Sequence, residues 1–444
     1  MFNPMTTEQE EETPLDLIEE SKKLNVLPSG WITIKLEEAA QYINGYPFKP
    51  SDWKEKGLPI IRIQNLNDGS KPYNFFDEQI LDKYRVHYGD ILISWSASLG
   101  AYRWDGGDAW LNQHIFKAIV KPDIIDRDFF YWAMKNIIEH LVALSNGSTM
   151  HHVVLKTFLN AQIPLPSPPE QRAIAHVLQT INQAIQTRRK ELELELERKA
   201  ALIQHLFTHG TRNEATKQSE VGEIPESWEI CRIQCVSEIA YGLTVNKTRS
   251  QSTQLVPYLA VMNVIRGALR LDEVKYIGML AGDLERYRLK KGDVLLIEGN
   301  GNPALLGSAA IWNDELPFAL HQNHLIRVRP NSDSILSEWL MYYLNSDYGR
   351  AQLLGKTKTS SGLHSINSRI VANLQVPLPS LPEQATITKT ISACTSKITA
   401  LEKEITLHEE LFRTLLDELM TGRISTLPLI EQLEREILTD EQRT

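Results

Sequence analysis

The sequence has little cysteine and no long apolar run. Its 444 residues include 3 cysteines, too few for a disulfide framework, so we expect a reducing compartment. No stretch approaches the roughly 18–20 apolar residues of a membrane span. Residues 1–26 are acidic and lack the basic-then-apolar layout of a signal peptide. These absences predict a cytoplasmic globular protein.

Catalytic motifs are also missing. The sequence contains no Walker A loop, and the Gly-rich stretch 298–304 has Ala304 where a phosphate-binding loop would need its third glycine. Glu273-Val274-Lys275 resembles part of a nuclease motif, but no aspartate between residues 222 and 271 accompanies it. His114 has no nearby cluster of carboxylates. We therefore predict no catalytic residues, no metal site and no cofactor bound by this chain.

The net charge of −9 is unevenly distributed. Residues 1–26 carry 2 Lys/Arg against 7 Asp/Glu, and residues 380–420 carry 4 against 7. Residues 27–165 are balanced at 14 against 15, whereas residues 224–379 carry 16 against 14. Because the excess acid lies mostly outside these two central blocks, a local basic surface for nucleic acid remains possible there.

The strongest feature is an internal duplication with a period of about 200 residues, far longer than solenoid repeats. Four segments recur in order: 27–31 (LPSGW) as 224–228 (IPESW), 88–93 (YGDILI) as 291–296 (KGDVLL), 112–114 (NQH) as 322–324 (QNH), and 163–171 (IPLPSPPEQ) as 376–384 (VPLPSLPEQ). The last pair matches at seven of nine positions. The chain therefore consists of two related blocks.

A long helix is predicted after each Pro-Glu-Gln segment, because nearly forty residues follow without an internal Gly or Pro. Apolar residues recur at alternating spacings of four and three, a pattern typical of a coiled coil. The predicted helix-pair interface comprises Ile174, Leu178, Ile181, Ile185, Leu192, Leu202, Leu206, Ile387, Ile391, Cys394, Ile398, Leu401, Ile405, Phe412, Leu415 and Leu419. Arg188, Glu195 and Lys199 interrupt the pattern with polar side chains. One face of a globular helical bundle is the alternative interpretation.

The duplicated motifs resemble those of the specificity subunits of type I restriction enzymes, from about Leu27 to Arg423. The resemblance implies two target recognition domains, each recognising half of a split DNA target. It also implies an antiparallel helix pair that sets their spacing and docks two modification (methyltransferase) subunits, with restriction (translocase–nuclease) subunits joining them. S-adenosylmethionine, ATP and Mg are then expected on those partner subunits.

The expected fold class is α+β, because short β-rich runs and helical stretches do not alternate regularly. The expected organisation is an acidic segment (1–26), the first recognition domain (27–165), a central helix (166–210), a linker (211–223), the second recognition domain (224–379), a distal helix (380–422) and a C-terminal tail (423–444). The helices would form an antiparallel coiled coil.

Candidate DNA contacts are polar residues on predicted loops, since base edges are recognised by side chains that donate or accept hydrogen bonds. In the first domain they are Lys49, Ser51, Lys54, Arg62, Gln64, Asn65, Ser96, Ser98, Ser148, Thr149, His151 and His152. In the second they are Lys247, Arg249, Asn263, Arg266, Lys356, Lys358, Thr359, Ser360, Ser361, His364 and Arg369. The predicted loop 355–364, rich in lysines and hydroxyls, is the strongest candidate segment. Trp31 and Trp228 are expected to be packing anchors.

Two other functions remain open at this point. One is a single-chain methyltransferase or nuclease with built-in recognition domains, although the catalytic motifs that it would need are missing. The other is a duplicated coiled-coil scaffold that does not bind DNA. Salt-dependent DNA binding with the modification subunit present would distinguish a scaffold from a specificity subunit.

Overall fold

The structure, a computed structural model, describes residues 27–95, 99–145, 155–300, 302, 304–355, 358–360 and 363–441. The chain divides into a first unit, Met1–Arg189 with Lys403–Thr444, and a second unit, Lys190–Glu402. Each unit contains one recognition domain and half of each long helix. Among the described residues, no helix is both long and apolar enough to span a membrane.

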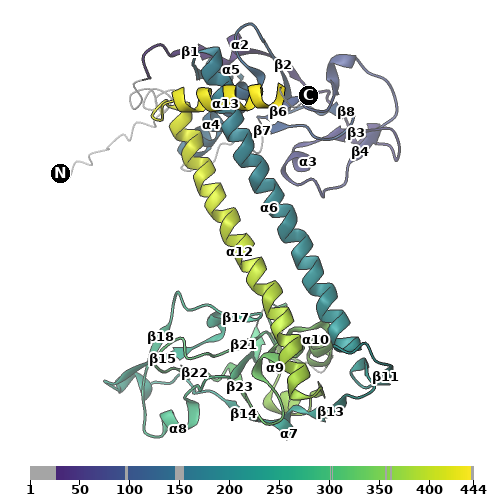
Figure 1. Cartoon of the computed structure of the whole chain (residues 1–444), viewed down its shortest axis with the longest axis vertical. Coiled ribbons are helices and arrows are strands. Elements are labelled where there is room, and N and C mark those ends of the chain that lie inside the picture. The colour runs from purple at the N-terminus through teal and green to yellow at the C-terminus, as the bar shows by residue number, and fades with distance from the viewer. Residues whose placement is uncertain are drawn as a thin grey trace, which may run out of the picture. The chain divides into compact units, whose positions relative to one another are not determined.

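The first recognition domain is built on two four-stranded sheets (Figure 1). One has the order β2 (Ala40–Asn44), β9 (Ile115–Val120), β6 (Ile91–Ser94), β7 (Gly100–Arg103) and is antiparallel. The other has the order β4 (Asn74–Phe76), β3 (Leu58–Ile61), β8 (Ala109–Leu111), β5 (Arg85–Val86), with β3 and β8 parallel. β1 (Ile32–Lys35) pairs with β10 (Gln162–Leu165). The helices are α2 (Leu36–Ala39), η1 (Pro50–Asp52), α3 (Ile63–Asn67), η2 (Asp82–Tyr84), α4 (Arg127–Ser145) and α5 (Leu155–Asn160).

The second recognition domain repeats this arrangement. Its antiparallel sheet has the order β14 (Ser237–Tyr241), β23 (Leu325–Pro330), β19 (Val294–Ile297), β21 (Ala309–Ile311). Its other main sheet has the order β18 (Lys275–Gly278), β15 (Leu255–Leu259), β22 (Leu320–His321), again with a parallel pair, β15 and β22. β13 (Glu229–Arg232) pairs with β26 (Gln375–Leu378) as β1 does with β10.

Smaller elements complete the second domain. The pairs are β11 (Thr216–Ser219) with β12 (Gly222–Pro225), and β16 (Val264–Ile265) with β17 (Ala268–Leu269). The helices are α7 (Ile233–Val236), η3 (Arg249–Gln251), η4 (Val261–Asn263), α8 (Asp283–Tyr287), α9 (Ser337–Asn345), α10 (Asp347–Leu354) and α11 (Ser368–Ala372). A small sheet has the order β20 (Gly299–Asn300), β25 (Leu363–Ser365), β24 (Lys358–Ser360).

The two long helices are α6 (Pro168–His209) and α12 (Leu381–Met420). They lie antiparallel within each unit (Figure 1): Arg188 and Arg189 contact Glu404 and Glu409 in the first unit, whereas Arg198 contacts Cys394 in the second. All sixteen residues predicted for the helix-pair interface are buried or half-buried. Burial of these apolar side chains stabilises the pair. The α+β class and the long helix pair expected from the sequence are confirmed.

The ends of the helices join the domain cores. Ile174 and Leu178 of α6 pack in one core cluster with Phe129 and Trp132 of the first domain. Ile387 of α12 packs in the corresponding cluster of the second domain with Trp228. Because each helix pair contributes to a domain core, each unit is a single packed body rather than a domain with a separate stalk.

Several charged residues of the two long helices form ion pairs or hydrogen bonds with one another. In the first unit, Arg188 lies 3.1 Å from Glu404. In the second, Glu195 accepts hydrogen bonds from Arg198 and lies 3.5 Å from Lys397. The hydrogen bond from Arg198 is the main reason that the pKa of Glu195 is lowered, whereas burial lowers the pKa of Lys199. Such polar pairs favour one register of the two helices over others.

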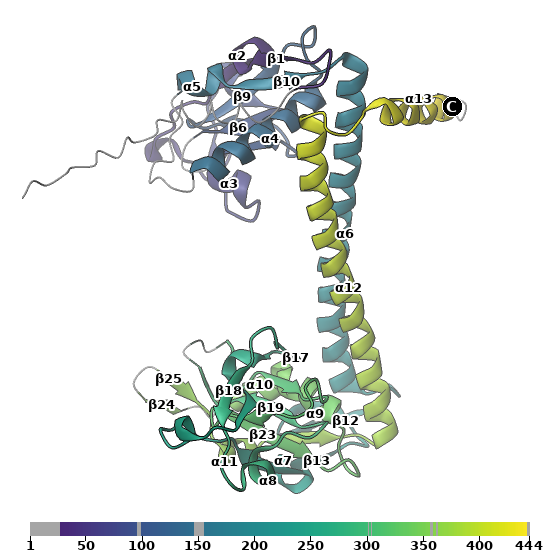
Figure 2. The same cartoon turned by 90° about the vertical axis from the view of Figure 1, so that its left-hand side faces the viewer.

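Two expectations from the sequence need correction. The predicted loop 355–364 contains two paired strands, β24 and β25, which Figure 2 shows beside each other. Residues 62–65 do not form a loop after β3, because the chain turns directly into α3. The C-terminal tail contains a helix, α13 (Leu427–Glu441). The acidic segment 1–26 lies outside the described residues.

Candidate nucleic-acid interface

The first duplicated feature is a junction between each domain and the start of its helix. The Pro-x-x-Trp segments form the same turn, with Trp31 N donating to Pro28 O and Trp228 N donating to Pro225 O, both at 3.1 Å. The indole of Trp31 donates to Glu170 Oε1 at 3.1 Å. The indole of Trp228 donates to Glu383 Oε2 at 3.3 Å. The tryptophans are buried packing anchors, as expected from the sequence.

The C-terminal glycine of the other helix closes each junction. Gly422, which follows α12, and Gly210, which follows α6, have φ of +68° and +63°. A Cβ on Gly422 would lie 2.1 Å from Pro28 Cγ. A Cβ on Gly210 would lie 2.7 Å from Glu383 Oε1. Left-handed backbone and close packing both require glycine at these positions.

The glutamine of each Pro-Glu-Gln segment ties the long helix to a helix of the domain. Gln171 donates to Pro166 O at 2.8 Å and accepts from Asp126 N at 2.7 Å, just before α4. Gln384 donates to Pro379 O at 2.9 Å and accepts from Leu336 N at 2.8 Å, just before α9. Both side chains are buried. The most recognisable repeated motifs are therefore structural, because they hold domain and helix together.

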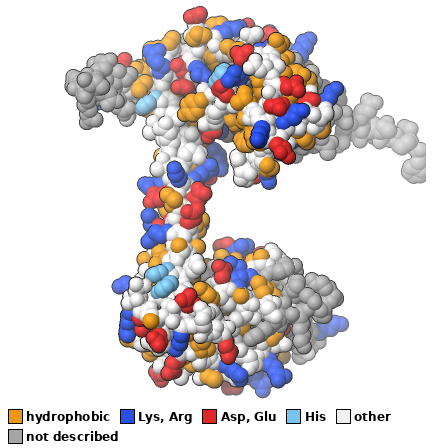
Figure 3. All heavy atoms as spheres, turned by 90° about the vertical axis from the view of Figure 1, so that its right-hand side faces the viewer, with side chains coloured by type: hydrophobic (Ala, Val, Ile, Leu, Met, Phe, Trp, Pro, Cys, Tyr) orange, Lys and Arg blue, Asp and Glu red, His pale blue; other side chains and the backbone are white. Residues whose placement is uncertain are grey.

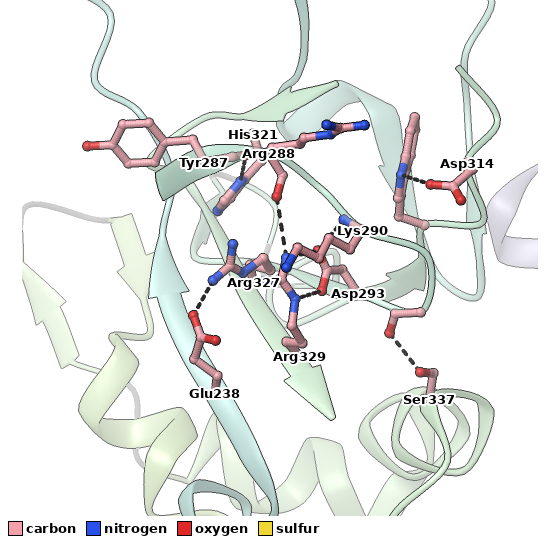
Figure 4. Close-up of polar contacts among 12 residues, drawn as sticks. Glu238, Tyr287, Arg288, Lys290, Asp293, Asp314, His321, Arg327, Arg329 and Ser337 are labelled. Carbon is pink, nitrogen blue, oxygen red and sulfur yellow. Dashed lines mark hydrogen bonds and ion pairs between the residues drawn. The ribbon is translucent and has the colours of Figure 1, made fainter. Parts of the chain in front are cut away.

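The repeated Gly-Asp segment differs between the domains in what surrounds its aspartate. Asp293 is fully buried and accepts from Arg329 Nε at 2.6 Å and Nη2 at 2.8 Å (Figure 4). Asp90, its counterpart, is partly exposed and lies 3.8 Å from Arg127. Both aspartates cap their own turn, accepting from His87 N and Lys290 N respectively. Both domains therefore contain the same capped Gly-Asp turn, and only the second domain adds a buried ion pair to it.

His321 and Arg327 lie beside this ion pair in the second domain. The ring of His321 contacts the carbonyl of Tyr287 at 2.9 Å, and Arg327 donates to Glu238 at 2.5 Å (Figure 4). Burial lowers the pKa of His321 to about 4. The imidazole is therefore neutral at pH 7. Burial also lowers the pKa of Arg327.

A second duplicated feature, which we call the shared turn, comprises residues 112–114 and 322–324. Asn112 N donates to Ile61 O at 3.2 Å, and Gln322 N donates to Leu259 O at 2.9 Å. Each turn leaves its first two residues half-buried and its histidine exposed. Gly45 and Gly242 pass close to the backbone of the shared turn or of the residue before it. A Cβ on Gly45 would lie 2.0 Å from Asn112 O, and a Cβ on Gly242 would lie 2.2 Å from His321 O, so neither position has room for a side chain. The backbone hydrogen bond to the neighbouring strand and the nearby glycine are therefore common to both turns, whereas only His114, and not His324, has a positive φ.

An open cavity of about 440 Å³ lies beside the shared turn of the first domain. Its lining residues are Arg62, Ile63, Gln64, Asn67, Asn112, Gln113 and His114. Arg62 and Gln64 were candidate DNA contacts, and the structure brings them together with the shared turn. Ile63, Asn67, Asn112 and Gln113 were missed as contacts, although the repetition of Asn-Gln-His as Gln-Asn-His was a signal that could have identified the turn.

Most other described candidates are exposed but scattered. Lys49, Ser51 and Lys54 lie around η1, while Lys247, Arg266 and Arg369 lie on separate segments of the second domain. On the face drawn in Figure 3, Lys and Arg side chains are interspersed with Asp and Glu. The described residues also contain no group of three or more His, Cys, Asp or Glu positioned to hold a metal ion.

Asn65, Asn263 and Arg249 are corrections, because their polar atoms are used within the protein. Asn65 accepts from Arg62 N at 3.2 Å and donates to Lys71 O at 3.1 Å. Asn263 accepts from Ala260 N and donates to Arg270 O, both at 2.9 Å. Arg249 pairs with Asp283 at 2.5 Å. All three are buried, so none presents its side chain to DNA.

Several candidates cannot be placed on a surface. Ser96, Ser98, Ser148, Thr149, His151, His152, Lys356 and Ser361 lie outside the described residues. For Lys358, Thr359, Ser360 and His364 the backbone belongs to β24 and β25. Their role in DNA contact stays a prediction.

Comparison with known proteins identifies the same duplication. The family model described as "Type I restriction modification DNA specificity domain" matches residues 28–198 and 225–410. The MjaVIII specificity subunit of Methanocaldococcus jannaschii is 27% identical over 411 residues, covering 90% of this chain and 94% of that protein. The EcoBI specificity subunit of Escherichia coli is 24% identical, covering 88% and 85%.

Two solved structures share the fold. The type I restriction-modification S subunit from M. genitalium superposes with a TM-score of 0.58 at 17% identity, covering 89% of this chain and 97% of that one. A chain from a study of complex assembly and conformational transition of the type I R-M system gives a TM-score of 0.51 at 18% identity, covering 90% and 100%.

Proposed function

The chain belongs to the type I restriction-modification DNA specificity family, and we propose that it recognises a split DNA target for a type I restriction–modification complex. Residues 27–165 would recognise one half of the target, and residues 224–379 the other. The helix pair would set the gap between the halves and dock the methyltransferase subunits. The observation that carries this proposal is the family match in two copies, each of which covers one set of the duplicated segments and ends within a long helix.

In this role the chain would be non-catalytic. Methyl transfer would take place on two modification subunits that bind S-adenosylmethionine, and cleavage on restriction subunits that use ATP and Mg in the cytoplasm. The chain's own contribution would be geometric: it would place each domain on its half-site and hold the methyltransferases nearby. Names of relatives as specificity subunits support the proposal.

The test is to express the full chain with its modification subunit in cells and map methylated bases across the genome. The expected result is one bipartite, asymmetric motif that disappears when the chain is omitted. Exchanging residues 224–379 for those of a relative should change only one half of the motif. Methylation that does not depend on the chain would contradict the proposal, as would methyl transfer by the purified chain alone.

A further inference from the structure

The cavity in the first domain has the side-chain chemistry that recognises base edges. Arg62 presents a guanidinium, which can donate two hydrogen bonds to guanine O6 and N7. Gln64 and Gln113 carry amides, which can bond adenine N6 and N7. These three residues line the same open cavity of about 440 Å³. One guanidinium and several side-chain amides therefore line a single cavity, whereas the other candidate DNA contacts are scattered over the surface.

Arg62 is oriented before any ligand arrives. Its guanidinium lies 5.2 Å from the centre of the Trp53 ring and donates through Nη1 to Asn74 Oδ1 at 3.0 Å. A stacked, hydrogen-bonded Arg loses less conformational entropy on binding than a free side chain. One edge of the guanidinium is occupied by Asn74, and the side chain stays partly exposed. This arrangement suits a directional contact with a base better than a diffuse contact with phosphate.

The backbone of the shared turn is strained at this cavity. His114 has φ of +74°, a conformation that residues other than glycine adopt infrequently. Its ring lies 5.2 Å from the Trp95 ring. Backbone held in such a conformation is often part of a ligand-binding site. Here it fixes the direction in which Gln113 and His114 leave the turn.

The second domain has different side chains at the equivalent positions. Ile61 and Leu259 occupy equivalent positions, because the backbone carbonyl of each accepts a hydrogen bond from the first residue of the shared turn. Arg62 therefore corresponds to Ala260, and Gln64 to Met262. Trp95 corresponds to Glu298, because their backbone N–H groups donate to His114 O and His324 O at 3.3 and 2.9 Å.

These replacements change what the site can recognise. Ala260 has no donor where the first domain has a guanidinium. Met262 is 40% exposed and apolar, which suits a thymine methyl rather than a hydrogen-bonding edge. Glu298 lies 3.0 Å from His324 Nδ1 and can only accept when ionised.

We propose that the side chains around the shared turn determine which bases each domain accepts: Arg62, Gln64 and Gln113 in the first domain, and Met262, Glu298 and Asn323 in the second. Arg62 contacts a guanine of the first half-site. The second half-site has no equivalent guanine contact, because Ala260 replaces the arginine. This inference rests on the proposed function and names the residues that carry specificity within it.

The experiment compares Arg62→Ala, Arg62→Lys and Gln64→Ala in the full chain, expressed with the modification subunit. Methylated motifs are mapped across the genome. Both Arg62 variants should relax one guanine position of the first half-site by about 5- to 150-fold in discrimination, because Lys keeps the charge but loses the fork. The second half-site should not change. Gln64→Ala alters an exposed side chain and should relax a different position of the first half-site without disturbing the core.

Two controls separate the possible failures. Lys156→Ala, which changes an exposed residue of the same domain outside the cavity lining and outside the candidate DNA contacts, should leave the motif unchanged. Met262→Ala should alter only the second half-site. A wild-type chain that directs a bipartite motif, with all three first-domain variants leaving that motif unchanged, would overturn the inference and leave the proposed function intact. A wild-type chain that directs no bipartite motif would overturn both.

Discussion

The two recognition domains share the residues that attach them to the helices and differ in those around the shared turn. Trp31 and Trp228 bond equivalent glutamates, and Gln171 and Gln384 bond equivalent backbone groups. Beside the shared turn, in contrast, an arginine in one domain corresponds to an alanine in the other. Duplicated domains must meet the helix pair in the same way, but they need not accept the same bases. The comparison therefore separates the structural frame from the surface that is free to diverge.

The domains also differ in how they bury charge. The second domain encloses Asp293 with Arg329 and Arg249 with Asp283. Among the described residues of the first domain, the ion pairs, such as Arg103 with Asp128, are at least partly exposed. Breaking a buried pair leaves an uncompensated charge, whereas an exposed pair contributes little. The same type of substitution should therefore have unequal effects in the two domains.

The largest effect should come from the junction tryptophans. Trp228→Ala should lower the free energy of unfolding of the second unit by about 3–5 kcal/mol, because it removes a buried ring packed 5.4 Å from Trp339. Trp31→Ala should act at the lower end of that range in the first unit. Hydrogen exchange measures this best, since a chain of two units need not unfold in one step. Protection should fall in β13 and β26 for one variant and in β1 and β10 for the other.

The matched controls are Trp228→Phe and Trp31→Phe, which keep an aromatic ring but remove the hydrogen bond to glutamate. They should cost less than the alanine variants. Equal loss of protection in both units from either alanine variant would contradict the assignment of one tryptophan to each junction.

The aspartates of the Gly-Asp segments test the difference in buried charge. Asp293→Ala should destabilise the second unit by about 3 kcal/mol, because Arg329 loses both of its bonds to the carboxylate. Asp90→Ala should cost about 1 kcal/mol, mostly from the lost cap to His87 N. Thermal unfolding of the full chain, followed by hydrogen exchange, compares the two. Similar losses from both variants would show that burial of the Asp293 pair has no energetic consequence.

The helix pair and its junctions with the domains were easier to predict from the sequence than the residues that contact DNA. The apolar spacing and the absence of Gly and Pro defined the helix pair, because packing of a long interface imposes a strict periodicity. The repeated Trp and Pro-Glu-Gln segments marked the junctions for a similar reason, since the tryptophan, glutamate and glutamine each make the same specific hydrogen bonds in both copies. The strands at 358–360 and 363–365 were not expected, because such short polar segments carry no comparable periodicity. α13 was also missed, although Ile430, Leu433 and Ile437 recur at helical spacing and were a signal for it.

Individual DNA contacts were harder to predict because polar side chains serve two purposes. Asn65 and Asn263 follow β-rich runs just as Gln64 does, yet they cap their own turns and are buried. Only the folded structure separates a capping amide from one at the rim of a cavity. Likewise, the partner of Arg249 is Asp283, 34 residues away, a distance across which sequence spacing gives no information.

Asn65 and Asn263 offer a direct test of this correction. Asn65→Ala and Asn263→Ala should each cost about 1–3 kcal/mol, because each removes a buried amide and leaves the backbone groups that it bonds without a partner. The losses should be similar in the two units, since both amides make the same type of cap. The methylation motif, mapped with the modification subunit present, should stay the same for both variants. A changed base preference would instead place either amide in contact with DNA.

The smallest effect should appear at the glutamate of the first junction, and it should depend on pH. Although burial alone would raise the pKa of Glu170, hydrogen bonds from Ser167, Trp31 and Thr426 lower it below its usual value. A lowered pKa in the folded state means that Glu170 stabilises the first unit above about pH 4, and that this contribution is lost as the pH falls further.

Thr426→Val removes the donor that lies 2.9 Å from Glu170 Oε1. At pH 7 it should cost about 1 kcal/mol. The difference between wild type and variant should shrink as the pH falls through the lowered pKa of Glu170, because the carboxylate becomes protonated in both proteins. Calorimetry at several pH values measures this, with Thr211→Val as the matched control at the second junction, where the backbone N of Thr211 still donates to Glu383 at 3.0 Å. A Thr426→Val effect that is the same at every pH would mean that the threonine acts through packing rather than through the charge of Glu170.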